Sequence, residues 1–361
     1  MKAALWHGRQ DLRVMDVPKP VPAEDEVVIK VMRCGICGTD IHDYEDGPHS
    51  IPVDKPDPLT GVTAPVIMGH ELCGVVTELG SKVEDWKIGD RVVVAPLLHC
   101  GKCYFCKRGL EHLCVIQAGL GLQTYWGGFA EYCCLKDYQL RKMPDYMTWD
   151  QGALVEPTNL AMYAIRRSGL QPGDNVLISG GGPIAMLILM CANAAGAGKI
   201  YMTEKHNERI EFMKKLGANE VWNITETNPL EEIQKRTGGV GVDVAFEVTG
   251  TQAGMDLCFE ALRKRGQYVQ YGLALGDRIV HPWQWAVKDL NICGLWCTNN
   301  YDYDGMVQLV ADGKINSTAI VTKHIALDDI VTEGFNCLKR GSKEKKDLKI
   351  LVCPNGMDTE K

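Results

Sequence analysis

The chain up to about residue 155 alternates short apolar runs with turn-forming residues. Runs that resemble β-strands cover Glu26 to Met32, Cys73 to Leu79 and Arg91 to Ala95, and turn sequences such as Lys87-Ile-Gly-Asp90 separate them. Short runs rich in valine, bounded by Gly, Pro and Asp, are typical of strands joined by tight turns. The pattern therefore predicts an irregular, barrel-like β domain.

From about Pro172 the apolar runs alternate with segments long enough to form helices. The runs that predict strands are Asn175 to Ser179, Lys199 to Glu204, Val242 to Val248, Gln267 to Gly272 and Asn291 to Leu295. Alternation of buried strands with helices is typical of a parallel sheet that carries helices on both faces. We therefore expect an α/β, doubly wound domain of the Rossmann type.

Beyond about Cys297 the pattern changes again. It predicts a helix over Asp304 to Ala311, a strand around His324, a second helix through Phe335 and a last strand over Leu348 to Cys353. This tail is too short to fold alone, so we expect it to return to the first domain. The predicted boundaries are 1–156 for a catalytic β domain, 157–297 for a dinucleotide-binding domain and 298–361 for the returning segment.

Length and charge narrow the class of protein. A chain of 361 residues exceeds what one hydrophobic core usually serves, which agrees with two domains. The net charge of −7, with acids and bases interspersed, disfavours a nucleic-acid-binding or anionic lipid-binding surface. The apolar stretch from Ile184 to Ala195 is too short to span a membrane. We expect no nucleic-acid partner and no membrane partner.

The cysteines and the N-terminal sequence indicate the compartment. The apolar run of the opening Met-Lys-Ala-Ala-Leu-Trp-His-Gly ends within six residues, which predicts no secretory signal. Fifteen cysteines in such a chain are better explained by free thiols and metal ligands than by disulfides. We therefore expect a cytoplasmic protein.

Four of the cysteines have the spacing of a metal site. Cys100, Cys103, Cys106 and Cys114 are separated by two, two and seven residues. Thiolates spaced by a two-residue turn can share one tetrahedral zinc ion. Four sulfur ligands leave no position for water or substrate, so this site is predicted to be structural, and the chemistry must lie elsewhere.

A glycine-rich loop follows the strand predicted to end at Ser179. Gly180-Gly-Gly182-Pro183-Ile184-Ala185 fits the pattern G-x-G-x-x-A and opens a helix-length segment. Gly180 permits a tight turn, Gly182 lets the backbone approach a pyrophosphate, and the phosphates lie at the helix N-terminus. The context of strand, loop and helix favours a dinucleotide site over a plain βαβ turn.

Glu204 indicates which dinucleotide binds. It stands nineteen residues after Ala185, at the end of the next predicted strand. A carboxylate at this place accepts hydrogen bonds from a ribose and repels a 2′-phosphate. Arg209 and Lys205 partly offset that repulsion. The sequence thus favours NAD over NADP.

Two motifs of the first domain supply mixed metal ligands. One is Cys34-Gly-Ile-Cys37-Gly-Thr39-Asp40-Ile-His42, and the other is Gly69-His70-Glu71. Thiolate, imidazole and carboxylate together are typical of a catalytic zinc, which keeps one position open. Glu156 is a further candidate ligand, although a plain helix-entry glutamate before Pro157 explains it equally well. Cys34 and Cys37 form a C-x-x-C, but the surrounding pattern is not that of a thioredoxin, so we expect Cys37 to ligate while Cys34 is buried beside it.

These motifs, in this order, resemble those of the zinc-dependent medium-chain alcohol and polyol dehydrogenases over nearly the whole chain. The resemblance includes Val248-Thr249-Gly250, which borders the nicotinamide in the family. It implies a GroES-like β-barrel catalytic domain followed by a Rossmann domain. Within the family, the insertion from Asp46 to Gly61 and the ending around Lys349 to Val352 are most similar to the 2,3-butanediol dehydrogenases.

The resemblance also implies roles for the candidate residues. Cys37, His70 and Glu156 would bind the catalytic zinc, with Glu71 as an exchangeable ligand or an outer partner. Thr39 would take the proton of the substrate hydroxyl and pass it toward His42. The residues implied to bind the cofactor are Gly180, Gly182, Pro183, Ile184, Glu204, Arg209 and Thr249. Two zinc ions per chain, one catalytic and one structural, and NAD are the implied cofactors.

The expected activity is hydride transfer between NAD(H) and a secondary alcohol or ketone, with 2,3-butanediol and acetoin as the leading pair. Zinc and cofactor motifs do not distinguish this pair from sorbitol, glycerol or threonine, and Glu156-Pro-Thr-Asn159 departs from the family's usual apolar continuation, which bears on the substrate. A zinc-stabilised NAD-binding sensor without turnover is the alternative of another class, but it would need neither an open metal position nor a proton relay. The resemblance further implies a homodimer or homotetramer.

Overall fold

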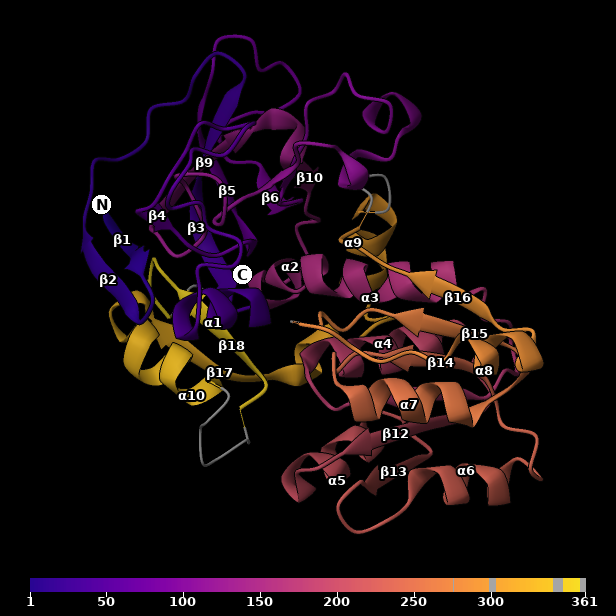
Figure 1. Ribbon diagram of the computed structural model, residues 1–361. Coiled ribbons are helices and arrows are strands. Elements are labelled where there is room, and N and C mark those ends of the chain that lie inside the picture. Colours follow the sequence, from indigo (N-terminus) through magenta and orange to yellow (C-terminus); the bar gives the residue numbers. More distant parts are fainter. Residues whose placement is uncertain (275, 299–302, 340–346, 358–361) are drawn as a thin grey trace. The chain divides into compact units, whose positions relative to one another are not determined.

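The computed structural model describes residues 1–274, 276–298, 303–339 and 347–357. The chain divides into two compact units, one formed by Met1–Glu156 with Thr298–Lys361 and the other by Pro157–Cys297. Each unit is built around its own sheet (Figure 1). The fold is α/β, and the two units are described separately below.

The unit Pro157–Cys297 contains a six-stranded sheet in the order β13-β12-β11-β14-β15-β16, in which every pairing is parallel. The strands are β11 (Val176–Ser179), β12 (Ile200–Glu204), β13 (Glu220–Asn223), β14 (Val242–Glu247), β15 (Leu262–Gln270) and β16 (Asn291–Gly294). From β11 the chain proceeds outward in one direction, and from β14 it proceeds in the other. The order therefore reverses between β11 and β14, as in a doubly wound dinucleotide-binding fold.

Helices lie on both sides of this sheet, one before β11 and the others between successive strands (Figure 1). They are α3 (Val155–Ser168), α4 (Pro183–Ala194), α5 (Asn207–Lys215), α6 (Pro229–Arg236), α7 (Gln252–Ala261) and α8 (Pro282–Lys288). Leu177 and Tyr201 pack with α6 and α7 in one apolar cluster. Because side chains alternate along a strand, the fully buried Ile178 and Met202 face the other side, so both faces of the sheet are covered.

The other unit contains a larger, mostly antiparallel sheet in the order β10-β6-β5-β3-β18-β17, with β9 paired to β3. Its strands are β3 (Glu26–Gly35), β5 (Glu71–Leu79), β6 (Arg91–Val94), β9 (Tyr132–Lys136), β10 (Leu140–Lys142), β17 (Val321–Ala326) and β18 (Lys349–Cys353). Smaller sheets are formed by β1 (Lys2–Gly8), β2 (Asp11–Asp16) and β4 (Val66–Ile67), and by β7 (Leu97–Leu98) and β8 (Ala118–Gly119). The strand β18 pairs with β3 through Leu351 and Val352, so the last part of the chain completes this sheet.

The helical segments of this unit are short. Within the described residues they are α1 (Gly38–Glu45), α2 (Trp149–Ala153), α9 (Tyr303–Ala311), a π-helix (Ile330–Phe335), α10 (Asn336–Leu338) and the 3₁₀ turns Cys106–Arg108, Glu111–Leu113, Asp137–Gln139, Ser317–Ile320 and Leu327–Asp329. The segment through Phe335, predicted as a regular helix, is thus a π-helical turn followed by one helical turn. Ile29, Leu72, Val92, Phe129 and Ile350 belong to one buried cluster at the centre of the unit.

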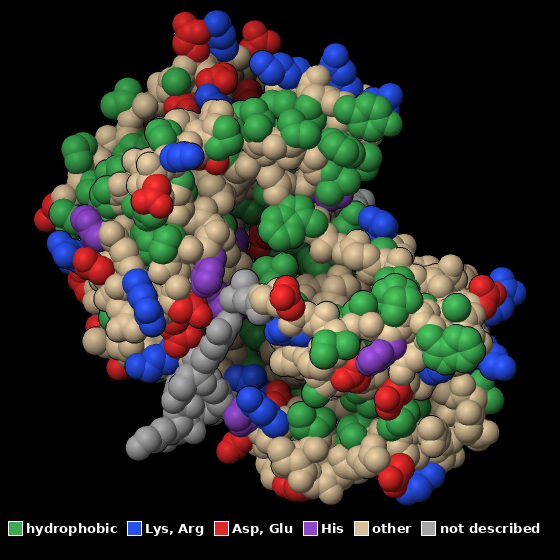
Figure 2. Space-filling view, viewed as in Figure 1, with side chains coloured by type: hydrophobic (Ala, Val, Ile, Leu, Met, Phe, Trp, Pro, Cys, Tyr) green, Lys and Arg blue, Asp and Glu red, His purple; other side chains and the backbone are tan. Residues whose placement is uncertain are grey.

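The surface carries both charge signs. Figure 2 shows Lys and Arg beside Asp and Glu over the visible face, with apolar side chains between them. Of the helices in the described ranges, none is long and apolar enough to cross a membrane.

Candidate active site and cofactor site

Cys37 lies at the junction between β3 and α1, which carries the other residues of its motif. Its backbone N–H donates to Oδ2 of Asp40, 2.9 Å away, which caps the first turn of the helix. Thr39 Oγ1 lies 3.8 Å from Cys37 Sγ. His42 is on the next turn of α1 and is half-buried. The N-cap residue and the body of one short helix therefore carry the thiol, the hydroxyl and the second imidazole of the predicted site.

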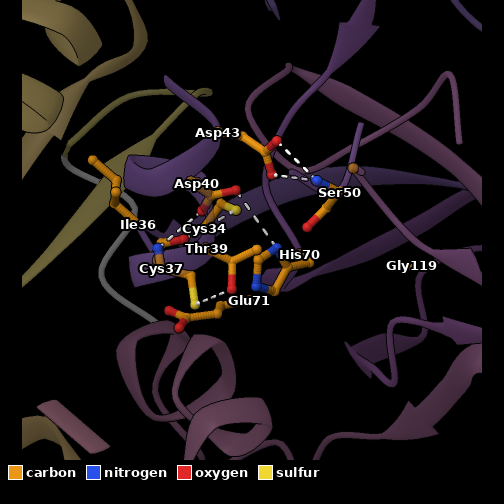
Figure 3. A network of polar contacts seen from close by, with 12 residues as sticks. Cys34, Ile36, Cys37, Thr39, Asp40, Asp43, Ser50, His70, Glu71 and Gly119 are labelled. Carbon is orange, nitrogen blue, oxygen red and sulfur yellow. Dashed lines mark hydrogen bonds and ion pairs between the residues drawn. The ribbon is translucent and has the colours of Figure 1, made fainter. Parts of the chain in front are cut away.

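His70 precedes β5 and lies beside Asp40. Its Nδ1 lies 3.6 Å from Oδ1 of Asp40, while the rest of the ring is directed toward Cys37 and Thr39 (Figure 3). Burial alone would lower the pKa of His70, but the negative charges of Asp40, Cys37 and Glu156 raise it well above its usual value. A carboxylate on one ring nitrogen is the arrangement that orients a metal-binding histidine, because it leaves the other nitrogen to face the metal.

Glu156 lies in the first turn of α3 and belongs to the same group. Burial raises its pKa to about 7, against the opposing effect of His70. Its Oε2 is buried and has no hydrogen-bond partner among the described residues. A buried carboxylate oxygen without a partner is costly, and a divalent cation held with Cys37 and His70 would satisfy it. The donor set therefore fits a zinc ion with mixed ligands.

Glu71, the residue after His70, differs from Glu156 because a lysine binds its carboxylate. Lys349 of β18 places its Nζ 2.7 Å from Oε1 and 2.6 Å from Oε2 of Glu71, and 3.0 Å from the carbonyl oxygen of Ile36. Glu71 and Lys349 are only 1% and 2% exposed. Both oxygens of Glu71 are thus engaged by a buried ammonium group.

Cys100, Cys103, Cys106 and Cys114 converge in a loop between β7 and β8. Their sulfur atoms all lie within 4.8 Å of one another, and no other group of three or more His, Cys, Asp or Glu side chains in the described ranges is that compact. The backbone N–H of Cys106 donates to Cys103 Sγ at 3.5 Å, and backbone N–H groups lower the pKa of Cys103 to about 6. The group has the composition and closeness of a structural zinc site, whereas Cys37, His70 and Glu156 are more loosely spaced.

The glycine-rich loop joins β11 to α4. Gly180 has a φ of +115°, and a Cβ there would lie 2.8 Å from Thr249, so both the turn and the packing require glycine. A Cβ at Gly181 would lie 2.4 Å from Glu204 Oε2. Gly182 is the N-cap of α4, with Pro183 and Ile184 in its first turn, and the space where a Cβ of Gly182 would lie is open. An open backbone at the N-terminus of a twelve-residue helix suits a pyrophosphate.

Glu204 ends β12 beside that loop. Its Oε1 accepts the backbone N–H groups of Lys205 and His206 at 2.6 and 3.1 Å. Arg209 lies 3.8 Å from its Oε2 and donates to the carbonyl oxygen of Gly181 at 3.4 Å. Burial lowers the pKa of Arg209, while Glu204 opposes that effect. The structure therefore brings Glu204 and Arg209 together at the glycine-rich loop.

Thr249 follows β14, on the other side of the point where the strand order reverses. Its backbone N–H donates to Oε1 of the fully buried Glu247 at 2.8 Å, and its hydroxyl contacts the same oxygen. Gly250 N–H and Gln270 Nε2 donate to the other oxygen, at 3.0 and 2.8 Å. The loops after β11 and β14 thus meet at the position where such folds bind dinucleotides.

Several of these contacts were not predicted from the sequence. Asp40, Lys349, Gly181 and Glu247 received no role in the sequence interpretation. A signal existed for Asp40, because an acid three residues after Cys37 is typical of a capping box. The partners of Lys349 and Glu247 depend on strand pairing between distant segments, which the local pattern does not reveal.

The candidate zinc sites, the glycine-rich loop and the sheets of the two units together indicate the class of protein. Residues 23–145 match the family described as "Alcohol dehydrogenase GroES-like domain", and residues 183–312 match "Zinc-binding dehydrogenase". The chain belongs to this family of zinc-dependent, medium-chain alcohol dehydrogenases. It is therefore a zinc-dependent oxidoreductase that uses a nicotinamide dinucleotide, and the resemblance inferred from the motifs is confirmed.

Individual relatives cover the whole chain. The chain is 41% identical to the (R,R)-butanediol dehydrogenase of Bacillus subtilis, over 98% of this chain and 100% of that protein. It is 33% identical to the sorbitol dehydrogenase of the same organism, over 98% of both. The crystal structure of 2R,3R-butanediol dehydrogenase from Bacillus subtilis superposes with a TM-score of 0.91 at 40% identity, over 98% of this chain and 99% of that one.

Proposed function

We propose that this protein interconverts 2,3-butanediol and acetoin with NAD(H), with preference for the R,R diol. The observation that carries the proposal is the 41% identity to an (R,R)-butanediol dehydrogenase over essentially the full length of both chains. Identity to a sorbitol dehydrogenase is lower, at 33%, which makes a polyol the second candidate substrate.

In this proposal Cys37, His70 and Glu156 hold the catalytic zinc. The metal supplies Lewis-acid chemistry, which lowers the pKa of a bound alcohol and polarises a ketone in the reverse direction. Asp40 holds the imidazole of His70 in place. Thr39 accepts the proton of the substrate hydroxyl, and His42 delivers it to solvent, since an imidazole titrates near neutral pH.

The cofactor occupies the second unit in this proposal. Gly180, Gly182, Pro183 and Ile184 receive the pyrophosphate at the N-terminus of α4, Glu204 accepts the adenosine ribose hydroxyls, and Thr249 lies beside the nicotinamide. We propose NAD rather than NADP because the carboxylate of Glu204 would repel a 2′-phosphate. Arg209 is already engaged by Glu204 and Gly181, so it is not free to attract that phosphate.

The insertion from Asp46 to Gly61 supports a small substrate. Asp43, next to His42 on α1, is fully buried and accepts the backbone N–H group of His49 at 2.7 Å. It also accepts the backbone N–H group of Ser50 at 3.0 Å (Figure 3). Within the insertion, Gly61 N–H donates to the Asp57 carbonyl oxygen at 2.8 Å, and just after it Ala64 N–H donates back to the Pro52 carbonyl oxygen at 2.8 Å. The loop is therefore tethered to the helix that carries Thr39 and His42. We propose that it limits the pocket to short diols.

The deciding experiment measures kcat/KM of the purified protein. The panel comprises butanediol stereoisomers, acetoin, sorbitol, glycerol and threonine, each with NAD(H) and with NADP(H). We expect the R,R diol with NAD⁺ to give the highest value. A hexitol or threonine ahead of every butanediol by tenfold would overturn the substrate while leaving the zinc dehydrogenase assignment intact, and turnover of no alcohol would support the sensor alternative.

We also propose a role for each domain, an oligomeric state and a cellular location. Residues 1–156 with 298–361 form the catalytic domain, and residues 157–297 bind the dinucleotide. A homodimer or homotetramer is supported by apolar exposure along an edge of the parallel sheet: Trp283 of α8 and Ile292 of the edge strand β16 are 75% and 44% exposed. A cytoplasmic location is supported by the cysteines, which form no disulfide within the described residues.

A further inference from the structure

Asn355 stands in the turn that follows β18, and it is the only asparagine of the sequence that precedes a glycine. Asn-Gly is the pair most prone to spontaneous deamidation, because a glycine has no Cβ to keep the asparagine side chain away from its backbone nitrogen. The most reactive amide of the chain therefore lies just beyond the strand that pairs with both β17 and β3.

The fold holds the side chain of Asn355 in a fixed place. Its Nδ2 donates to the carbonyl oxygen of Val31 at 2.9 Å and to that of Glu131 at 2.8 Å, so both hydrogens of the amide have acceptors. The carbonyl oxygen of Glu131 also accepts the backbone N–H of Val31 at 3.0 Å. The amide thus ties the turn to β3 and to the residue before β9, beyond Leu351 and Val352, through which β18 pairs with β3.

The nitrogen that would attack this amide is engaged as well. The backbone N–H of Gly356 donates to the carbonyl oxygen of Cys353 at 3.2 Å. Deamidation needs this nitrogen to lose its proton and to reach Cγ of Asn355, so its bond to Cys353 and both contacts of Nδ2 must first break. In the folded protein the reaction therefore requires the turn after β18 to open, and its rate reports how often the turn does so.

We propose that Asn355 is a site of spontaneous covalent modification, which proceeds when the turn after β18 opens and then prevents the turn from closing. The deprotonated nitrogen of Gly356 forms a bond to Cγ of Asn355. The bond from Cγ to Nδ2 breaks, and Nδ2 leaves as ammonia with the proton that the glycine nitrogen gave up. Water then opens the resulting succinimide at one of its two carbonyl groups, which gives aspartate or isoaspartate.

The modified residue cannot make the native contacts. A carboxylate has no hydrogen to donate, so a negative charge at position 355 would face the carbonyl oxygens of Val31 and Glu131 in a half-buried place. Two lost hydrogen bonds, with repulsion in their place, disfavour the closed turn. One deamidation therefore converts a brief opening into a lasting one.

The first experiment keeps the purified full-length protein at mildly alkaline pH and follows individual asparagines by peptide mass spectrometry. Asn316, which is exposed and precedes Ser317, is the internal comparison. We expect Asn355 to deamidate at least about tenfold more slowly in the native protein than in protein unfolded by guanidinium chloride, whereas the exposed Asn316 should differ less. Equal rates at Asn355 in the two states, or no deamidation there in the unfolded chain, would overturn the proposal.

Two variants test the consequence of the modification. Asn355→Asp should lower the Tm by about 5 °C and speed hydrogen exchange of the β18 amide groups. Asn316→Asp is the matched control: it adds the same charge in the same unit and keeps an acceptor for the Thr318 hydroxyl, 3.0 Å away, so it should retain the parent's Tm.

Unchanged Tm and unchanged hydrogen exchange in Asn355→Asp would refute the effect on the turn. If that variant does not fold, deamidated protein separated from the aged sample by ion exchange provides the same comparison. Deamidated protein with the parent's Tm and hydrogen exchange would then refute it.

Discussion

At the scale of single residues, the hydroxyl of Thr39 and the imidazole of His42 should contribute unequally to kcat. Thr39 lies beside Cys37, whereas His42 is one turn further along and half-buried. We predict that Thr39→Ala lowers kcat by about 10²- to 10⁴-fold, the range typical of a lost proton-transfer group. His42→Ala should cost less, since water can replace the outer member of the relay.

Steady-state kinetics at neutral pH measure both losses. Thr39→Ser, which keeps the hydroxyl, is the matched control and should retain most of the activity. Equal losses in the two alanine variants, or a greater loss in His42→Ala, would count against the proposed direction of proton transfer.

At the scale of elements, the four-cysteine loop and the α1 site should hold zinc with different lability. The loop offers four sulfur atoms within 4.8 Å of one another, whereas the proposed catalytic site would have mixed ligands and one open position. We predict two zinc ions per chain by elemental analysis, of which mild chelation removes one together with the activity. One zinc at the outset would refute the two-site interpretation.

Two cysteine variants distinguish the loss of a zinc ligand in the four-cysteine loop from a general effect of removing a thiol. Cys106→Ser should leave one zinc per chain and lower the thermal stability, because four sulfurs organise a loop with little regular structure. Cys337→Ser, at a half-buried cysteine outside the loop, should keep both ions and the stability of the parent.

At the scale of the whole molecule, the exposed apolar residues of α8 and β16 indicate where a second copy packs. We predict that Trp283→Glu reduces the oligomeric state measured by sedimentation, since a charge in an apolar interface is costly. Ile224→Glu is the matched control: Ile224 is 47% exposed and follows β13, the strand at the opposite edge of the sheet. If both variants dissociate to the same extent, or if neither dissociates, α8 and β16 are not part of the subunit interface.

The sequence by itself determined the features that depend on local order. The alternation of apolar runs located β11, β12 and β14, and the α/β class followed from it. The glycine-rich loop was recognisable because strand, turn and helix are consecutive in the chain, and Gly180 has the positive φ that the motif requires. The spacing of Cys100, Cys103, Cys106 and Cys114 predicted their convergence, because neighbouring thiols on a short loop have few alternatives.

Only the tertiary structure decided which distant residues meet. Sequence motifs left Glu71 and Glu156 as competing ligands, and neither motif pointed to Lys349. The pairing of β18 with β3 brings Lys349 to Glu71 across 278 positions of the chain. Asp40 acquired its second partner in the same way, when the turn before β5 placed His70 beside α1. Local propensity cannot encode such contacts, because they depend on the register of strands that are distant in sequence.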